Sequence, residues 1–338
     1  MSTRQGKYTV KLDNAPSIVG FAALGSKRES EGPMAQYIDI LNADSMFGQT
    51  TWEKAESQMQ RQVAECAINK ANLSTQGIDY VLAGDLLNQC IGSHYGMREM
   101  DIPFIGLYGA CSTLAEGLGL GAVLVETGAA RTVMTVTSSH FCSAEKQYRF
   151  PLAYGGVRAP TSQWTVTGAG AAVLGKGSMP PYVRAVSFGS IEDKGVKDLN
   201  NMGAAMAPAA AQTLQRYFED TLTNQDNYDL ILTGDLSLVG SDLMQSLMMR
   251  EGYDLSGKHA DCGLMIYDRD TQPVEAGGSG CGCSAAVVCS YIAQSIREGK
   301  LQNVLFVGTG ALMSPVSVQQ GESIPCIAHL VHLSATPV

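Results

Sequence analysis

The sequence predicts an α/β protein in which two copies of one strand-and-helix unit follow each other along a chain of 338 residues. Three pairs of segments support this prediction, because the members of each pair have similar residues in the same order. The pairs are 80–85 (YVLAGD) with 228–235 (YDLILTGD), Cys111-Ser112 with Cys283-Ser284, and 133–139 with 304–310. Two of the offsets, 283 − 111 = 172 and 304 − 133 = 171, agree within one residue. This self-similarity indicates a duplication, and crossover helices between the strands predict mostly parallel strands in each copy.

Composition limits the classes of function. An apolar content of 45% is enough to fill a large core, whereas a formal charge of −9 argues against a nucleic-acid surface or a basic membrane-binding patch. Any anion-binding site must therefore be built locally. The nine cysteines are scattered through apolar or Gly-rich segments, which is typical of reduced thiols in an intracellular protein. Residues 1–12 lack a signal-peptide core and no run of about 18 apolar residues occurs, so we expect a soluble protein.

The first copy is expected to span 17–180, after a polar leader at 1–16. Apolar runs bounded by turn residues predict its strands, and apolar residues spaced by three to four predict its helices. In chain order, the expected elements are a strand at 18–25, a helix at 52–73, a strand at 79–85, an apolar run at 105–108, a helix from 112 to 125, and strands at 131–138 and 168–174.

The elbow Gly109-Ala110-Cys111-Ser112-Thr113 joins the apolar run to the long helix and is the centre of the predicted site. Ser112 or Thr113 can cap the free amides of that helix. A thiol at this position lies at the positive end of the helix, which favours a thiolate or a bound anion by about 0.3–1 kcal/mol. The alternative is that Cys111 is a small buried hydrophobic residue, which is common for a free cysteine.

A polar segment at 140–165 separates the last two strands of the first copy. It contains Lys146, Arg149 and Arg158 and has little apolar periodicity. We therefore expect a long loop that covers a site, rather than a part of the core.

The second copy is expected to span 181–338. Its predicted strands are 228–235, 304–310 and 326–333, the last of which contains His329, and its elbow is Cys283-Ser284. His259 is expected in a polar turn. If the copies pack face to face, the helices that begin at Ser112 and Ser284 direct their N-termini at a shared centre, which is where we expect the site.

A duplicated α/β unit with a cysteine at its first elbow resembles the thiolase and ketoacyl synthase superfamily. Seven strings extend the resemblance over nearly the whole chain. They are AGDLLNQ (83–89), YGACST (108–113), MGAAMAPAAA (202–211), ILTGDLS (231–237), KHADCGLMIY (258–267), GGSGCGCSA (277–285) and ESIPCIAH (322–329). Together they resemble the stage V sporulation protein AD (SpoVAD) family. The resemblance implies a thiolase-like fold, with two halves in a layered α-β-α-β-α arrangement related by a pseudo-two-fold axis.

The same resemblance implies a function. Members of the family bind pyridine-2,6-dicarboxylate (dipicolinic acid) and work with the membrane proteins of the SpoVA system in moving it into the developing spore. We therefore expect an intracellular homodimer that reaches the forespore membrane through its partners, with dipicolinate as its ligand, no nucleic acid and no cofactor.

The chain departs from the condensing enzymes at the catalytic positions. Cys111 takes the place of the nucleophile, but Gly234-Asp235 and Gly282 take the places of the two oxyanion donors, a histidine and a histidine or asparagine. Loss of one such donor typically lowers the rate by about 10²–10³. His259 or His329 can substitute only if the fold brings them to the centre. The prediction is a former enzyme pocket that is reused for binding; the alternatives are an acyltransferase or condensing enzyme with Cys111 as nucleophile, and a scaffold with a vestigial pocket.

Dipicolinate is a flat dianion, so its site needs cationic or amide donors for two carboxylates. We expect amides near Ser112 and Ser284 to contribute, with positive charge from Arg149, Lys146 or His140. The complete set of predicted ligand-binding residues is Cys111, Ser112, His140, Arg149, His259, Cys283, Ser284, Asp85 and Asp235.

Each of these residues also has a structural interpretation. Arg149 and His259 are equally typical of solvated polar segments, and His329 of a satisfied core histidine. Asp85 and Asp235 occupy matching positions after the central strands, which also suits acceptors that organise a loop. Cys281 and Cys283 form the one close cysteine pair, and without a second pair at ligand spacing we expect no metal site.

Overall fold

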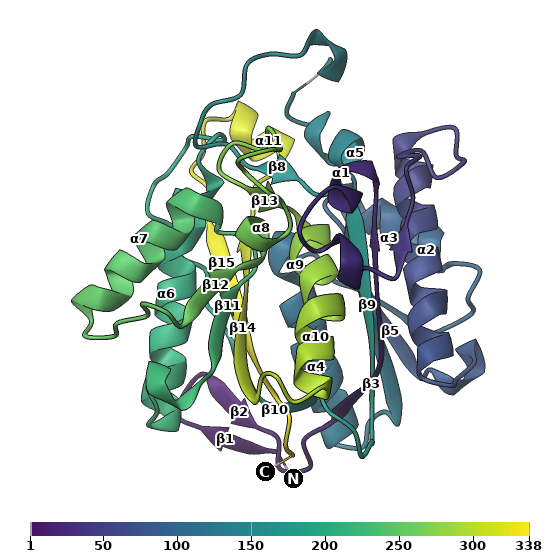
Figure 1. Cartoon of the computed structure of the whole chain (residues 1–338), viewed down its shortest axis with the longest axis vertical. Coiled ribbons are helices and arrows are strands. Elements are labelled where there is room, and N and C mark those ends of the chain that lie inside the picture. The colour runs from purple at the N-terminus through teal and green to yellow at the C-terminus, as the bar shows by residue number, and fades with distance from the viewer. Residues whose placement is uncertain (1, 150, 338) are drawn as a thin grey trace.

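The two copies are visible as two groups of five strands with the same spatial order (Figure 1). We describe a computed structural model in which residues 2–149 and 151–337 are placed. In the first group the order is β6 (Phe104–Gly106), β5 (Tyr80–Gly84), β7 (Thr132–Ser139), β9 (Gly168–Gly175) and β3 (Ser17–Gly25). In the second it is β12 (His259–Asp261), β11 (Leu230–Thr233), β14 (Asn303–Ala311), β15 (Cys326–Ser334) and β10 (Tyr182–Phe188). The predicted duplication is therefore confirmed.

Strand direction corrects one expectation. In the first group β5 runs parallel to β6 and β7, whereas β9 is antiparallel to β7 and β3. The second group repeats the pattern: β11 is parallel to β12 and β14, and β15 is antiparallel to β14 and β10. The expected parallel pairing therefore holds for three strands of each group, whereas β9 and β15 are reversed. They are reversed because the segments after β7 and β14 bring the chain back from the same end of the sheet, and such a return gives an antiparallel neighbour.

Helices form the remaining layers and confirm the α-β-α-β-α arrangement (Figure 1). The outer layer of the first half contains α2 (Trp52–Lys70) and α3 (Ile91–Met97). The outer layer of the second half contains α6 (Met202–Thr221) and α7 (Ser237–Arg250). The central layer contains α4 (Thr113–Glu126), α9 (Cys281–Val287) and α10 (Ala293–Arg297). Because α4 lies between the two groups of strands, its residues are apolar or small on nearly every side.

The expected leader contains structure of its own. Its residues include β1 (Thr3–Gln5) and β2 (Thr9–Lys11), which pair with each other, and β2 also pairs with β10 of the second half. The polar character of this segment follows from its place at the exposed margin of the sheet.

The segment 140–165 is more ordered than a loop. It contains α5 (Phe141–Glu145), a short turn of helix at Leu152–Tyr154 and β8 (Trp164–Thr165). β8 pairs with β13 (Gly278–Ser279), directly before the elbow of the second half. Figure 1 shows α5 and β8 at the same end of the molecule as α11 (Pro315–Gln319). This segment therefore connects the first half to the second at that end.

Candidate functional site

A cavity of about 600 Å³ opens at the elbow that contains Cys111. Both halves contribute to its wall, and so does the segment 140–165. The lining residues are Leu86, Tyr108, Ala110, Cys111, Ala144, Glu145, Gln147, Tyr148, Arg149, Arg158, Ser162, Gln163, Thr165, Leu199, Asn200, Met202, Ser279, Gly280, Ala311, Leu312, Met313 and Ser314. A cavity therefore lies at the predicted elbow, and residues of the segment 140–165 form part of its wall.

The elbow presents Ala110 and Cys111 to the cavity because of its backbone conformation. Ala110 has φ +50°, which turns the chain sharply between β6 and α4. The Ser112 hydroxyl donates to the Gly109 carbonyl at 2.6 Å, and the Thr113 hydroxyl donates to the Ala110 carbonyl at 2.6 Å. These side chains therefore hold the turn and do not cap the helix amides. Ser112 is fully buried and is not among the lining residues.

The Cys111 thiol lies in an environment that opposes ionisation. The residue is 7% exposed, and its thiol lies close to the carboxyl group of Asp235. Burial raises the pKa of the thiol well above its usual value, and the charges of Asp235 and Cys281 raise it further. The expectation that the helix N-terminus favours a thiolate was therefore wrong, because burial and a neighbouring acid outweigh the helix dipole.

Asp235 forms the floor beneath the thiol. Its carboxylate is fully buried and accepts hydrogen bonds from the Ser279 hydroxyl at 2.7 Å, the Gly280 amide at 3.0 Å and the Thr309 hydroxyl at 2.8 Å. Burial raises the pKa of Asp235, and these hydrogen bonds oppose the rise. The acid therefore joins the elbow of the second half to β14 and to Cys111.

Three charged side chains line the cavity, and all come from the covering segment. Arg158 Nη1 and Nη2 each lie 3.2 Å from one Glu145 oxygen, and Arg149 Nε lies 3.2 Å from Glu145 Oε2. Arg149 also donates to Asn200 Oδ1 at 2.8 Å. The formal charge of the lining is therefore positive by one unit. Arg158 was recognised in the sequence as a cation of the covering segment but was not selected as a site residue.

An aromatic pair supports Arg158 from behind. Its guanidinium lies 5.1 Å from the Trp164 ring centroid and 5.8 Å from that of Phe141, and the two rings stack at 4.2 Å. The Arg158 Nε is buried without a hydrogen-bond partner among the described residues. These contacts hold the guanidinium in one orientation.

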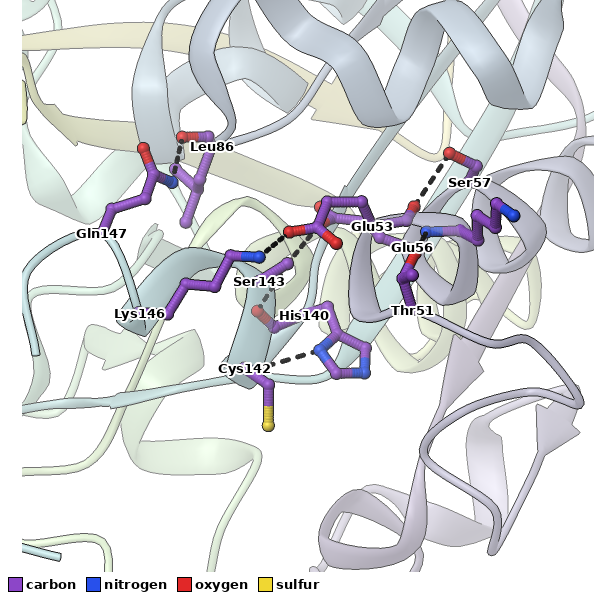
Figure 2. A network of polar contacts seen from close by, with 11 residues as sticks. Thr51, Glu53, Glu56, Ser57, Leu86, His140, Cys142, Ser143, Lys146 and Gln147 are labelled. Carbon is purple, nitrogen blue, oxygen red and sulfur yellow. Dashed lines mark hydrogen bonds and ion pairs between the residues drawn. The ribbon is translucent and has the colours of Figure 1, made fainter. Parts of the chain in front are cut away.

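Two of the predicted cations contact other parts of the chain and do not line the cavity; Figure 2 shows Lys146 directed at Glu53 and His140 beside Cys142. Lys146 forms an ion pair with Glu53 of α2. His140 contacts the Ser45 carbonyl at 2.8 Å through Nε2 and accepts from the Cys142 amide at 3.1 Å through Nδ1. Burial lowers the pKa of His140, so the ring is not a source of positive charge at neutral pH. Lys146 therefore joins the end of α5 to α2, and His140 joins its start to the chain at Ser45; neither is among the lining residues.

His259, which was predicted for the site, and His329, which was considered only as a substitute oxyanion donor, both lie outside the cavity lining. His259 lies on β12 rather than in a polar turn, and its Nε2 contacts the Thr233 hydroxyl at 2.9 Å. His329 Nδ1 accepts from the Gly189 amide at 3.2 Å. Burial lowers the pKa of each ring to about 4. Neither lines the cavity, so neither supplies the oxyanion donor that the elbow lacks.

Cys283 and Ser284 lie within α9 instead of before a helix, since α9 begins at Cys281. The Cys283 thiol lies 3.7 Å from the Gly234 carbonyl, and the Ser284 hydroxyl is buried with no partner among the described residues. Asp85 is also buried and accepts from the Leu87 amide at 2.8 Å. These three predicted residues are outside the cavity lining.

Sequence reasoning did not select several polar and aromatic lining residues. Tyr148 donates to the Met313 carbonyl at 3.3 Å, and burial raises the pKa of its hydroxyl to about 12. Gln163 donates to the Asp235 carbonyl. Tyr108 is part of the elbow string, and Tyr148 precedes Arg149, so their positions beside predicted site residues were the available signal.

The described part of the chain has neither a cluster of metal-ligating side chains nor a membrane-spanning helix. Residues 2–149 and 151–337 contain no group of three or more His, Cys, Asp or Glu side chains that could hold a metal ion. Within these ranges, no helix has both the length and the apolar character needed to cross a membrane.

Solved structures define the class of the fold. The chain superposes on 3-oxoacyl-[acyl-carrier-protein] synthase III from Aquifex aeolicus VF5 with a TM-score of 0.59, at 12% identity, over 95% of this chain and 100% of that one. For a single-substitution variant of OleA from Xanthomonas campestris the TM-score is 0.58, at 15% identity, over 95% and 98% of the two chains. The protein therefore has the thiolase-like fold of the ketoacyl synthases, and at this identity the likeness concerns the fold alone.

Sequence similarity then identifies the family. A model of the stage V sporulation protein AD (SpoVAD) family matches residues 6–334. The chain is also 43% identical to stage V sporulation protein AD of Bacillus subtilis (strain 168) over 324 residues, which is 96% of each protein. The chain belongs to the stage V sporulation protein AD family.

Proposed function

We propose that the cavity at Cys111 binds pyridine-2,6-dicarboxylate and that the protein is the dipicolinate-binding component of the SpoVA system, acting in uptake into the developing spore. The observation that carries this proposal is the convergence of Arg149 and Arg158 on a cavity at the N-terminal end of α4. In a chain of formal charge −9, this is the locally built positive site that an anionic ligand needs.

The lining suits a flat aromatic dianion. Arg149 supplies a planar guanidinium for one carboxylate, and the elbow amides at Ala110 and Cys111 lie at the positive end of α4 for the other. Tyr108 and Tyr148 supply aromatic surface for the ring. The volume of about 600 Å³ leaves room for the ligand and for ordered water.

Catalysis by Cys111 is the less supported use of the same cavity. A condensing enzyme or acyltransferase needs a thiolate and oxyanion donors. Burial and Asp235 instead raise the pKa of this thiol, and His259 and His329 lie outside the lining. We therefore assign Cys111 a role in the shape of the cavity, and a mixture with acyl-coenzyme A should leave its mass unchanged.

We also propose a homodimer and association with the membrane proteins of the SpoVA system at the forespore membrane. The support for the dimer is β6, the last strand on its side of the sheet, where Ile105 is 39% exposed. Nearby Tyr95 and Tyr108 are 54% and 55% exposed. An edge strand beside exposed apolar surface suits a second copy of the chain, and sedimentation equilibrium measures the resulting mass.

Calorimetric titration of dipicolinate tests the binding proposal. We expect saturable binding to the wild type and a loss of about 10- to 100-fold in affinity for Arg149→Gln, because the substitution removes a charged hydrogen-bond donor. Cys111→Ala should also weaken binding. Arg98→Gln is the matched control, since Arg98 lies outside the cavity and its side chain is 60% exposed. Absence of binding to the wild type, or equal losses for both arginine variants, would overturn the proposal.

A further inference from the structure

Glu145 is an unexpected residue for the wall of an anion site. Its carboxylate is 8% exposed and lines the cavity beside both arginines. It accepts from Arg158 through both oxygens at 3.2 Å and from the Thr165 hydroxyl at 3.1 Å, and Arg149 Nε lies 3.2 Å away. A negative charge in this position competes with any anionic ligand for the guanidinium groups.

The two arginines are not equivalent partners of Glu145. Arg158 is 13% exposed, presents both terminal nitrogens to the carboxylate and lies against Trp164. Arg149 is 32% exposed and offers Glu145 only its Nε, while one terminal nitrogen contacts Asn200. The two terminal nitrogens of Arg158 are therefore already paired within the protein, whereas the terminal nitrogens of Arg149 lie at the cavity wall beside Asn200.

We propose that Glu145 is a specificity-determining residue, an internal carboxylate that occupies Arg158 and leaves a ligand one guanidinium instead of two. The inference rests on the proposed function of the cavity as an anion site. Glu145 keeps the charge of the lining at plus one, so the second carboxylate of a ligand must be held by uncharged donors. Affinity is thereby limited, which suits a protein that must release its ligand.

An alternative role for Glu145 makes the opposite prediction. If the carboxylate only positions the arginines, its loss disorders them and weakens ligand binding. If it competes with the ligand, its loss strengthens binding, since the charge of the lining rises from one to two units. The sign of the change in affinity therefore separates the two roles.

The test is a titration of pyridine-2,6-dicarboxylate and pyridine-2-carboxylate into the wild type and Glu145→Gln. We expect the variant to bind the dicarboxylate about tenfold more tightly, with a smaller gain for the monocarboxylate, because the removed charge acts on two carboxylates of the former. The gain should shrink as salt is raised. Equal or weaker binding of the dicarboxylate would overturn the proposal.

A matched control removes an acid of α2 that lies outside the cavity lining. Glu53 forms an ion pair with Lys146, outside the lining, so Glu53→Gln changes the charge by the same amount and also loosens α5 (Figure 2). We expect affinity within about threefold of the wild type for this variant, since its charge lies farther from the ligand. A gain equal to that of Glu145→Gln would show a general charge effect and overturn the assignment to Glu145.

The double variant Glu145→Gln/Arg149→Gln guards against misfolding of the single variant, because it removes a carboxylate and a guanidinium together. With Glu145 absent, Arg158 Nη1 loses that carboxylate and becomes available to the ligand, while Nη2 still donates to the Gln163 carbonyl. The double variant should therefore bind more tightly than Arg149→Gln alone, by about tenfold. Binding weaker than that of Arg149→Gln would show that Glu145 is a structural support and overturn the proposal.

A readout without dipicolinate separates this inference from the proposed function. Phenylglyoxal modifies accessible arginines, and peptide mass spectrometry reports the rate at Arg149 and Arg158. We expect faster modification of both in Glu145→Gln than in the wild type and in Glu53→Gln. If the wild type binds no dipicolinate, the proposed function fails, yet faster modification still supports Glu145 as the internal competitor, and an unchanged rate overturns it.

Discussion

Asp85 and Asp235 occupy matching positions in the two halves, each directly after a central strand. Both are buried, and burial raises the pKa of each. The partners of Asp85 belong to its own connection: the Leu87 amide at 2.8 Å, the Ser93 amide at 2.7 Å and the Ser93 hydroxyl at 2.6 Å. Asp235 instead gathers Ser279, Gly280 and Thr309 from distant parts of the second half and contacts Cys111 of the first.

The difference shows how one duplicated position acquires two uses. A buried carboxylate must be satisfied by hydrogen bonds wherever it lies. In the first half the following turn supplies them, so Asp85 organises a loop. In the second half the elbow and β14 supply them, so Asp235 lies buried behind the cavity lining and sets the environment of the Cys111 thiol.

The largest expected effect comes from removing either acid. Asp85→Ala and Asp235→Ala each leave three buried donors without an acceptor, and we expect each to lower the free energy of unfolding by about 3–5 kcal/mol, measured with urea. Only Asp235→Ala should lower the pKa of Cys111, because the charge of Asp235 raises it and that of Asp85 does not. The pH dependence of alkylation at Cys111 checks this. An equal change in both variants would contradict the division of roles.

The sequence was sufficient to predict the fold and the elbow at which the cavity opens, because both depend on local patterns. Strings repeated between the halves predict the same elements twice, and a cysteine between a strand and a helix marks the elbow. The cavity does open at Cys111 and Arg149, and the segment 140–165 does cover it.

The choice among polar residues depended on packing that no local pattern reports. Lys146 and Arg149 are three residues apart in one segment, yet Lys146 meets Glu53 of α2 and Arg149 meets Glu145 in the cavity. His259 was expected in a polar turn, but it lies on β12. Because β12 pairs with β11, the His259 ring contacts Thr233. Glu145 was missed because the sequence does not show that this acid of the segment 140–165 packs against both arginines.

The two elbows also differ in how tightly their glycines are enclosed. A Cβ on Gly282 would lie 2.3 Å from the Gly168 carbonyl oxygen, a backbone atom that cannot move away. A Cβ on Gly109 would meet the Glu116 and Ser112 side chains, which can rotate. We expect Gly282→Ala to lower the free energy of unfolding by about 3 kcal/mol and Gly109→Ala by about 1 kcal/mol, measured by urea unfolding. Equal losses would mean that both elbows are equally enclosed.

An effect that appears only as the pH is lowered concerns the buried histidines, which are concentrated in the second half. His332 contacts the Tyr217 hydroxyl at 3.2 Å and Asn303 Oδ1 at 3.1 Å, and burial lowers its pKa to about 3. Above the unfolded pKa of about 6.5, the ring is neutral in both states. Between that value and about 3, only the unfolded state takes up the proton, so stability falls as the pH falls.

For this one ring, the loss between pH 7 and pH 5 is about 2 kcal/mol. His332→Gln removes that contribution, so its stability should fall by about 2 kcal/mol less than that of the wild type over the same interval. Urea unfolding at pH 7, 6 and 5 gives the free energy of unfolding of the wild type and the variant at each pH. The stability of each protein is compared with its own value at pH 7, so the loss of the two hydrogen bonds in the variant cancels. If the stability of the two proteins has the same pH dependence, the His332 ring is already protonated in the folded state at pH 5. In that case His332 does not make the second half sensitive to acid.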